Sequence, residues 1–271
     1  MNYVISLMKE IVRKRKLIWD LAKADFRKRF VGSYFGMVWM LVQPIVTVLI
    51  YFFIFQVGFK SVPPVPGVPY VLWLIPGIVP WFFYSEALNC VTGCLQEYSY
   101  LVKKVVFQVE ILPIIKLISC MLVHAFFAGI MLAVFLCYGC FPMATWIQIL
   151  YYSFAAAMLA LAFGYLTSAI NVFFKDMAQI VSICLQFGMW LTPIMWIVEA
   201  SPLMGHPVIM KILKLNPMYY IVSGYRDALI NKTAFWEYPG LTLWFWGITL
   251  FILWAGTTMF KRLRVHFADV L

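Results

Sequence analysis

A long run of uncharged residues near the start of the sequence constrains this chain most. From Val31 to Val57 no side chain is charged, and the run follows a basic cluster of Arg27, Lys28 and Arg29. About 20 apolar residues, at a rise of ~1.5 Å per residue, cross the ~30 Å hydrocarbon core of a bilayer. The run is therefore a predicted transmembrane helix. Basic residues beside a span mark its cytoplasmic end, so this helix is predicted to begin in the cytoplasm.

The composition agrees with a protein that is partly solvated by lipid. Hydrophobic residues make up 64% and charged residues 12% of the 271 residues, whereas soluble domains carry roughly 25% charged residues. The net charge of +10 does not indicate nucleic-acid binding, because 9 of the 21 lysines and arginines precede Phe30 and three more are Lys261, Arg262 and Arg264. Basic residues that flank spans are typical of cytoplasmic anchors beside anionic lipid.

Six apolar segments of the sequence are long enough to cross a bilayer, which predicts an all-α membrane protein with six transmembrane helices. Both ends of the chain are then cytoplasmic, because basic residues precede the first segment and follow the last. Pro76 and Pro80 predict that the outer half of the second segment is broken, since irregular backbone at membrane depth must be buried in protein or face water. The segments are residues 33–56, 70–95, 113–139, 145–172, 177–198 and 240–260.

The fourth segment carries a row of small side chains. Ala156, Ala160, Gly164 and Ser168 recur at every fourth position, and residues with that spacing lie on the same side of a helix. Small residues let two helices approach closely within a membrane. We therefore predict that a second helix packs along this row.

Residues 1–30 are predicted to form a separate N-terminal helix, and residues 31–271 a single six-span domain. Between residues 2 and 28, apolar side chains recur at three- and four-residue spacing and basic side chains fill the other face, which is typical of a helix lying on a membrane. Two interpretations stay open: a lipid anchor, and a docking surface for a cytoplasmic partner. The candidate residues of this surface are Arg13, Lys16, Trp19 and Arg27.

The segment between the second and third spans, residues 97–112, is predicted to be a short cytoplasmic amphipathic helix. Leu101, Val105 and Val109 form an apolar stripe, and Glu110 lies beside it. A partner protein can bury such a stripe in a groove and pair with the carboxylate. We therefore predict that energy from a partner enters the chain here, with Glu110 paired to a basic group of that partner.

Residues 199–239 make up the longest predicted outer segment. Prolines interrupt it and leave two short helical pieces, 208–214 and 219–231. The segment is too apolar for a free loop, so it is predicted to dip back into the outer leaflet.

The sequence lacks the short motifs of common catalytic and nucleotide-binding sites. It has no phosphate-binding loop of the Gly-x-x-x-x-Gly-Lys-Ser/Thr type, no His-Glu-x-x-His and no Gly-x-Ser-x-Gly. The three histidines, His124, His206 and His266, lie far apart along the sequence. No catalytic residue, metal site or cofactor is therefore predicted in this chain, and His124 is interpreted as a hydrogen-bonded packing residue.

Aromatic residues are abundant, at 18% of the chain, and some lie away from the predicted interfaces. Trp39, Trp81 and Phe82 are deeper than the interfacial belts in which tryptophan and tyrosine are enriched. Because aromatic faces stack against the C–H faces of sugars, these rings predict a conduit for a glycan, together with Tyr34 and Glu86. Packing or lipid contact is the alternative for each ring. Glu86, an acid within a span, is either functional or a paired structural residue.

Six stretches carry a likeness to a known family: residues 29–44, 101–113, 171–176, 192–196, 216–226 and 267–269. Together they resemble the permease subunits of type-2 ABC exporters, in the branch that exports lipid-linked O-antigen, capsule and teichoic acid polymers. The resemblance covers nearly the whole chain. Gln108 departs from the family pattern, in which proline is expected after Phe107.

The resemblance implies a role for each region outside the spans. Residues 97–113 would be the coupling helix that docks into the ATPase, residues 2–28 an interface helix, and residues 199–239 the outer gate helices. The implied coupling residues are Leu101, Lys103, Lys104, Phe107 and Glu110, and the implied gate residues are Asn216, Tyr219, Tyr220 and Arg226.

The function predicted from these features is that of a multi-pass permease in the bacterial cytoplasmic (inner) membrane, which exports a polyprenyl-linked polysaccharide. ATP and magnesium would bind to a separate ATPase chain. Because no inverted repeat is visible in the sequence, a pore with two-fold symmetry would come from a homodimer. Two alternatives remain: a type-2 ABC exporter of a small lipid or drug, and a polytopic membrane enzyme acting on polyprenyl-linked sugars.

Overall fold

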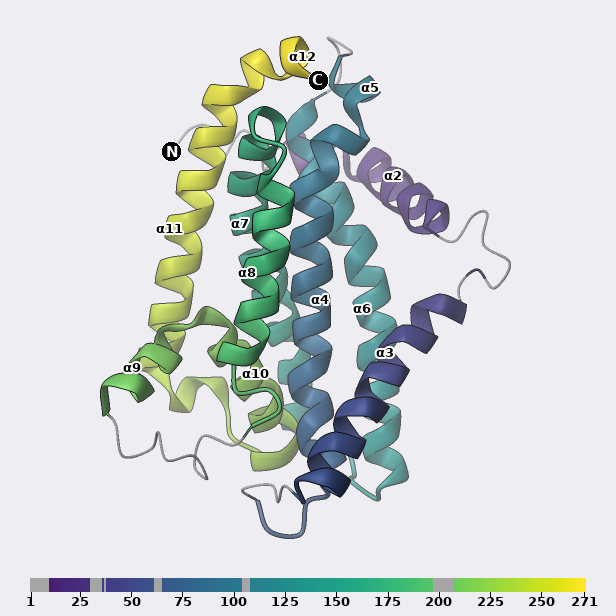
Figure 1. Cartoon of the computed structure of the whole chain (residues 1–271), viewed down its shortest axis with the longest axis vertical. Coiled ribbons are helices and arrows are strands. Elements are labelled where there is room, and N and C mark those ends of the chain that lie inside the picture. Colours follow the sequence, from purple (N-terminus) through teal and green to yellow (C-terminus); the bar gives the residue numbers. More distant parts are fainter. Residues whose placement is uncertain (1–9, 30–35, 37, 61–64, 104–107, 197–206) are drawn as a thin grey trace.

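The computed structural model of the chain describes residues 10–29, 36, 38–60, 65–103, 108–196 and 207–271, which form helices and turns with no strand among them. Helices α4, α6, α7, α8 and α11 run roughly along the long axis of an elongated bundle (Figure 1). The predicted all-α fold is therefore confirmed. The main helices are α2 (Arg15–Lys28), α3 (Val38–Phe52), α4 (Tyr70–Glu97), α5 (Ser99–Val102), α6 (Leu112–Cys137), α7 (Gln148–Phe173), α8 (Met177–Leu191), α9 (Pro207–Leu215), α10 (Pro217–Arg226), α11 (Pro239–Leu263) and α12 (Phe267–Val270).

The two ends of the bundle carry different short elements (Figure 1). Helices α2, α5 and α12 lie at one end, which we name the α2 end. Helices α9 and α10 lie at the other, which we name the α10 end. The bundle between them is built from the apolar helices.

Four helical stretches of the described part are long and apolar enough to cross a membrane. Two further apolar helices, Pro44–Gly58 and Met177–Leu191, are shorter. Lipid offers no hydrogen-bond partner to the backbone, so a long apolar segment forms a helix, in which its backbone groups bond to one another. The four long stretches are Tyr70–Glu97, Val109–Cys137, Ala144–Phe173 and Pro239–Val270.

Helix α4 is continuous, so the prediction that Pro76 and Pro80 break its outer half is wrong. A proline removes the backbone hydrogen bond to the carbonyl four residues before it, which for Pro76 is that of Leu72. The carbonyl oxygen of Trp73, in the same turn, accepts a hydrogen bond from Nε of Arg226 on α10 at 3.2 Å, so a contact from another helix holds this turn. Helix α4 also packs against α6, α7, α8 and α10.

The row of small residues on α7 packs against another helix, as predicted. Ala156 and Ala160 are fully buried. A Cβ added to Gly164 would lie 2.4 Å from Cγ1 of Val91 on α4, so only glycine permits this approach. Gly256 of α11 also lies close to α7, since its added Cβ would be 2.9 Å from the Ala162 carbonyl oxygen. Helix α7 is thus held between α4 and α11.

The segment predicted as one amphipathic helix over 97–112 is divided instead. Helix α4 continues to Glu97, α5 covers only Ser99–Val102, and Val109–Ile111 is a single 3₁₀ turn. Gln108 is extended, with φ −85° and ψ 101°, and its side-chain oxygen accepts a hydrogen bond from Lys14 Nζ at 2.7 Å. A tertiary contact to the N-terminal segment thus accompanies the extended backbone of Gln108, and Val105 of the predicted stripe lies outside the described residues.

The two helical pieces predicted in 199–239 are present as α9 and α10, with α10 continued by a π-helical turn at Asp227–Asn231. Asn216 begins α10, because its side-chain oxygen accepts from the Met218 N–H at 3.0 Å. Pro217 follows at the first helical position, where its missing N–H costs nothing.

Helix α3 lies at the margin of the bundle, approaching α4 near the α10 end and diverging from it toward its own N-terminus (Figure 1). It exposes large apolar side chains, among them Leu49 at 58% and Ile50 at 50%. An apolar face of this size must contact lipid or another protein surface.

Candidate functional site

A buried charge cluster ties α2 to the bundle. Lys116 of α6 donates from Nζ to Oδ1 of Asp25 and to Oε2 of Glu97, each at 2.6 Å. Tyr98 donates its hydroxyl to the same Asp25 oxygen at 2.6 Å. Burial by itself raises the pKa of Asp25, but the hydrogen bonds from Lys116 and Tyr98 hold that pKa below its ordinary value. One lysine thus joins α2, α4 and α6.

A second contact anchors the end of α2. The guanidinium of Arg29 pairs with Glu86 of α4 and donates to the sulfurs of Cys90 at 3.4 Å and Cys120 at 3.1 Å. The oxygen of Glu86 and the two sulfurs lie within 4.8 Å of one another, which is close enough for a metal ion. In this structure a guanidinium already supplies the positive charge at that place. Of the two interpretations of Glu86, the contact favours the structurally paired one.

The 3₁₀ turn after Gln108 contacts the C-terminal segment. Glu110 is 6% exposed and pairs with Arg264, which follows α11, while the Tyr165 hydroxyl donates to the Glu110 carbonyl oxygen at 2.8 Å. In the isolated chain, Arg264 occupies the place predicted for a basic group of the partner, and the pairing of Glu110 with the partner stays a prediction. Leu101 is half-buried and Lys103 is exposed, and the predicted coupling residues Lys104 and Phe107 lie outside the described residues.

The predicted interface residues of the N-terminal helix all face outward. Arg13, Lys16, Trp19 and Arg27 are exposed, whereas Ile18 and Ala22 on the opposite face are buried against the bundle. The exposed face is available both to lipid headgroups and to a protein partner.

The rings predicted to line a conduit do not share one surface within the chain. Trp81 is 4% exposed and packs against Gly188 of α8. Phe82, next in sequence, lies with Glu86 beside a small cavity between α4 and α6. Trp39 is 54% exposed on α3, and Tyr34 lies outside the described residues. Among the predicted conduit rings that the structure describes, Trp39 is the most exposed.

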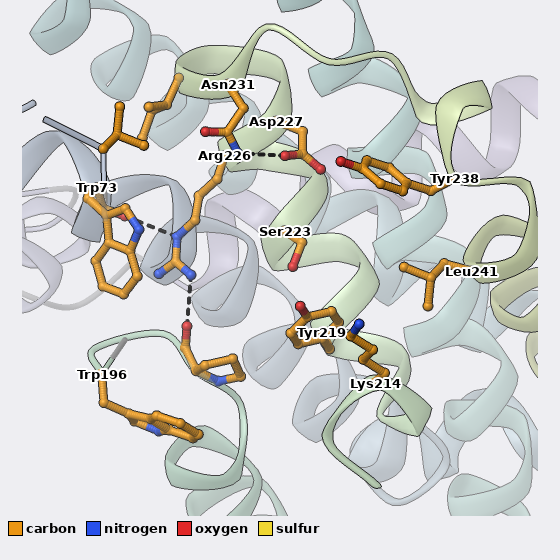
Figure 2. A pocket seen from close by; sticks show the side chains of 13 residues that line it. Trp73, Trp196, Lys214, Tyr219, Ser223, Arg226, Asp227, Asn231, Tyr238 and Leu241 are labelled. Atoms are coloured by element: carbon orange, nitrogen blue, oxygen red, sulfur yellow. Dashed lines mark hydrogen bonds between the residues drawn. The ribbon is translucent and has the colours of Figure 1, made fainter. Parts of the chain in front are cut away.

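At the α10 end, Arg226 acts as a structural link. Its guanidinium is 3.6 Å from the ring centroid of Trp73 and donates to the carbonyl oxygens of Pro193 at 2.8 Å and Ile194 at 2.7 Å. Gly77 permits this position, since a Cβ there would lie 2.9 Å from Nη2. The predicted gate residue thus joins α10, α4 and the segment after α8 (Figure 2).

The other predicted gate residues hold neighbouring elements together. Besides starting α10, Asn216 donates to Thr192 Oγ1 at 2.8 Å. The hydroxyl of Tyr220 is hydrogen-bonded to that of Tyr151 at 2.9 Å and to Thr242 Oγ1 at 3.1 Å. Tyr219 lines an open cavity of about 350 Å³ at this end of the bundle.

Of two polar clusters within the bundle, one was predicted from the sequence and the other was not. His124 hydrogen-bonds to the hydroxyls of Ser153 at 3.0 Å and Tyr225 at 2.9 Å, which confirms its interpretation as a packing residue. The buried charge cluster around Asp25 and Lys116 was not predicted. Lys116 is a lone lysine near the end of a predicted span, and such a residue signals a buried partner without naming it.

Apolar helices of membrane-crossing length, with ion pairs gathered at one end and short helices at the other, define a helical membrane protein. The chain belongs to the ABC-2 type transporter family, whose model matches residues 16–230. This confirms the resemblance drawn from the sequence. Members of this family are the membrane subunits of transporters, and such a permease requires an ATP-binding subunit as its partner.

The chain is similar over nearly its whole length to named permeases. It is 25% identical over 268 residues to the O-antigen export system permease protein RfbA of Myxococcus xanthus, covering 98% of this chain and 99% of that protein. It is also 25% identical over 257 residues to an O-antigen export system permease protein RfbA of Klebsiella pneumoniae, covering 94% of this chain and 95% of that protein.

Proposed function

We propose that this chain is the permease subunit of an ABC exporter that moves a lipid-linked O-antigen-type polysaccharide outward across the bacterial cytoplasmic membrane. The observation that carries the proposal is the end-to-end similarity to permeases named for O-antigen export. The match to the Myxococcus xanthus permease includes 98% of this chain. The apolar helices and the absence of a phosphate-binding loop from the sequence agree with a permease driven by a separate chain. ATP and magnesium would bind to that ATPase.

In the proposed topology, six helices cross the membrane and both termini are cytoplasmic. Four of these spans would be the long apolar stretches. The other two would be α8 and α3, the latter with its π-helical continuation, Phe53–Gly58. The α2 end would face the cytoplasm. The distribution of basic residues supports this orientation, because basic segments stay in the cytoplasm. Basic residues at the α2 end include those of α2, Lys103, and those that follow Phe260.

The ionic contacts at the α2 end suggest how the ATPase would drive the permease. The exposed face of α2 and the segment around residues 99–111 would meet the ATPase. Lys14 links the first of these surfaces to Gln108 of the second, and Arg29 connects α2 to Glu86 within α4. A displacement of either surface would therefore be passed to α4 and α6.

Two copies of the chain would enclose the conduit. The exposed apolar face of α3 is available to contact a second copy, with Trp39 beside the path of the glycan. Helices α9 and α10 would form the outer gate. Each polymer chain would enter while attached to its polyprenyl lipid.

Deletion of the gene in the encoding strain, followed by complementation, tests the proposal. Surface polysaccharide, separated by electrophoresis and stained, should disappear from the deletion strain and return with the wild-type gene. The ATPase should also co-purify with a tagged copy of the chain. Unchanged surface polysaccharide in the deletion strain, with no second permease gene of this family present, would contradict the proposed substrate.

A further inference from the structure

The cavity at the α10 end combines aromatic walls with polar groups. Its volume of about 350 Å³ falls in the range of ~300–1,000 Å³ that is typical of small-ligand pockets. Trp196 lies on one side and Tyr238 on the other, with Tyr219 between them (Figure 2). These rings come from the segment after α8, from the residue preceding α11, and from α10.

The polar groups of the cavity follow directly on the link made by Arg226. Asp227 is the next residue, and Asn231 donates from Nδ2 to Asp227 Oδ1 at 2.7 Å (Figure 2). Burial raises the pKa of Asp227, and the hydrogen bond from Asn231 opposes that change. Lys214 of α9 adds an ammonium group to the lining. The carboxylate is therefore held in place by its neighbours before any ligand arrives.

This set of groups fits a sugar better than a phosphate-bearing headgroup. Aromatic rings stack on the C–H faces of a sugar, and carboxylate, amide and ammonium groups hydrogen-bond to its hydroxyls. A phosphate needs several convergent cations. Here Arg226 is engaged with three backbone carbonyl groups, and the carboxylate of Asp227 would repel an anion.

We propose that this cavity is a saccharide-binding subsite, which holds one or two sugar units of the polymer as they leave the outer end of the permease. The inference rests on the proposed function and its topology, and adds a specific binding site to them. It assigns Tyr219 and Tyr238 to stacking, and Asp227, Asn231 and Lys214 to hydroxyl recognition.

Binding to the purified permease–ATPase complex in lipid nanodiscs tests the subsite. The probe is the set of short oligosaccharides released by mild acid from the surface polysaccharide of the encoding strain, and the readout is saturation-transfer NMR together with tryptophan fluorescence. Tyr238→Leu should weaken binding about 3- to 10-fold, as expected for the loss of one stacked ring. Asp227→Asn should weaken binding about 10-fold, because a charge-assisted hydrogen bond becomes a neutral one.

Tyr138→Leu is the matched control. Tyr138 is a 54% exposed tyrosine at the C-cap of α6, and it is not part of the cavity lining. Its replacement should leave binding unchanged. If Tyr238→Leu does not assemble with the ATPase, Asp227→Asn decides alone, since it preserves the shape of the side chain.

The subsite and the proposed function fail in different ways. No saturable binding by the wild-type complex at millimolar probe, or wild-type binding by Asp227→Asn, overturns the subsite while the loss of polysaccharide in the deletion strain still stands. Surface polysaccharide that persists in the deletion strain overturns the proposed function itself. Weakened binding in the cavity variants, with normal binding by Tyr138→Leu, supports the subsite.

Discussion

Lys116 and Asp25 form a buried ion pair, with Nζ and Oδ1 2.6 Å apart and side-chain exposures of 4% and 1%. The two residues belong to α6 and α2, which are 91 positions apart in sequence. A charge buried to this degree is tolerated only when it is paired and hydrogen-bonded. The pair therefore fixes where the N-terminal helix sits against the bundle.

Replacement of Asp25 should destabilise the chain. In Asp25→Ala the buried Lys116 keeps only one carboxylate partner, Glu97, and we expect a loss of about 2–3 kcal/mol, below the ~3–5 kcal/mol typical when a buried charge loses its partner altogether. The measurement is the midpoint of thermal unfolding in detergent, followed by fluorescence-detected size exclusion. Asp20→Ala is the control, because Asp20 lies on the same helix but is exposed. Equal midpoints for the two variants would contradict the role given to Asp25.

Close packing of α7 against α4 gives a second prediction. Gly164→Ala places a methyl group 2.4 Å from Cγ1 of Val91, and overpacking of this kind typically costs ~1–3 kcal/mol. Val91→Ala in the same chain should recover part of that loss by making room. Gly247→Ala is the matched control on α11, where an added Cβ meets nothing within 4 Å. Thermal midpoints of the four proteins provide the measurement, and an unaffected Gly164→Ala would show that the helices lie further apart.

The two tryptophans predicted for the conduit should behave differently. Trp81 is 4% exposed, so Trp81→Ala should cost ~3–5 kcal/mol through the cavity it leaves and reduce the amount of assembled permease. Trp39 is 54% exposed, so Trp39→Ala should leave stability within ~0.5 kcal/mol of wild type. If Trp39 lies beside the glycan path, export falls in Trp39→Ala while the protein level holds. The comparison requires surface polysaccharide per unit of folded permease, and wild-type export by Trp39→Ala would remove this ring from the path.

The long helices could be predicted from the sequence because their signal is local. An unbroken apolar run specifies a helix in lipid wherever its neighbours lie, and the run predicted over 70–95 is the observed helix Tyr70–Glu97. Prolines inside that run were misleading, because the turn before Pro76 is held by a hydrogen bond from Arg226 to the Trp73 carbonyl, and Arg226 is far away in sequence.

The contacts between distant segments could not be predicted in the same way. Residues 97–112 carry a helical pattern, yet Gln108 binds Lys14 and Glu110 binds Arg264. Neither partner is within one helical turn, so periodicity contains no information about them. The same holds for the stacking of Arg226 on Trp73. Charged residues in unusual places were visible in the sequence, but their partners depend on the tertiary fold.

The turn at Val109–Ile111 is held by one of two contacts of Glu110: the pair with Arg264 within the chain, or a pair with a basic group of the ATPase. Glu110 is 8% and Arg264 41% exposed at the side chain. If the pair holds the turn to the C-terminal segment, Glu110→Lys brings two positive charges together and should cost about 1–3 kcal/mol, between the values typical of surface and buried pairs. Export and transport-stimulated ATPase activity should fall with it.

The charge-swapped double variant Glu110→Lys with Arg264→Glu then decides between a contact within the chain and one to the partner. An intramolecular pair is restored by the swap, so thermal stability and export should both return toward wild type. A contact from Glu110 to a basic group of the ATPase would not be restored, because that group is unchanged, and the double variant would remain as inactive as Glu110→Lys. Arg262→Glu, an exposed arginine two residues before Arg264, controls for the added negative charge in the C-terminal segment. Recovery in the double variant, with near-normal export by Arg262→Glu, would establish that this turn is positioned by the chain's own C-terminal segment.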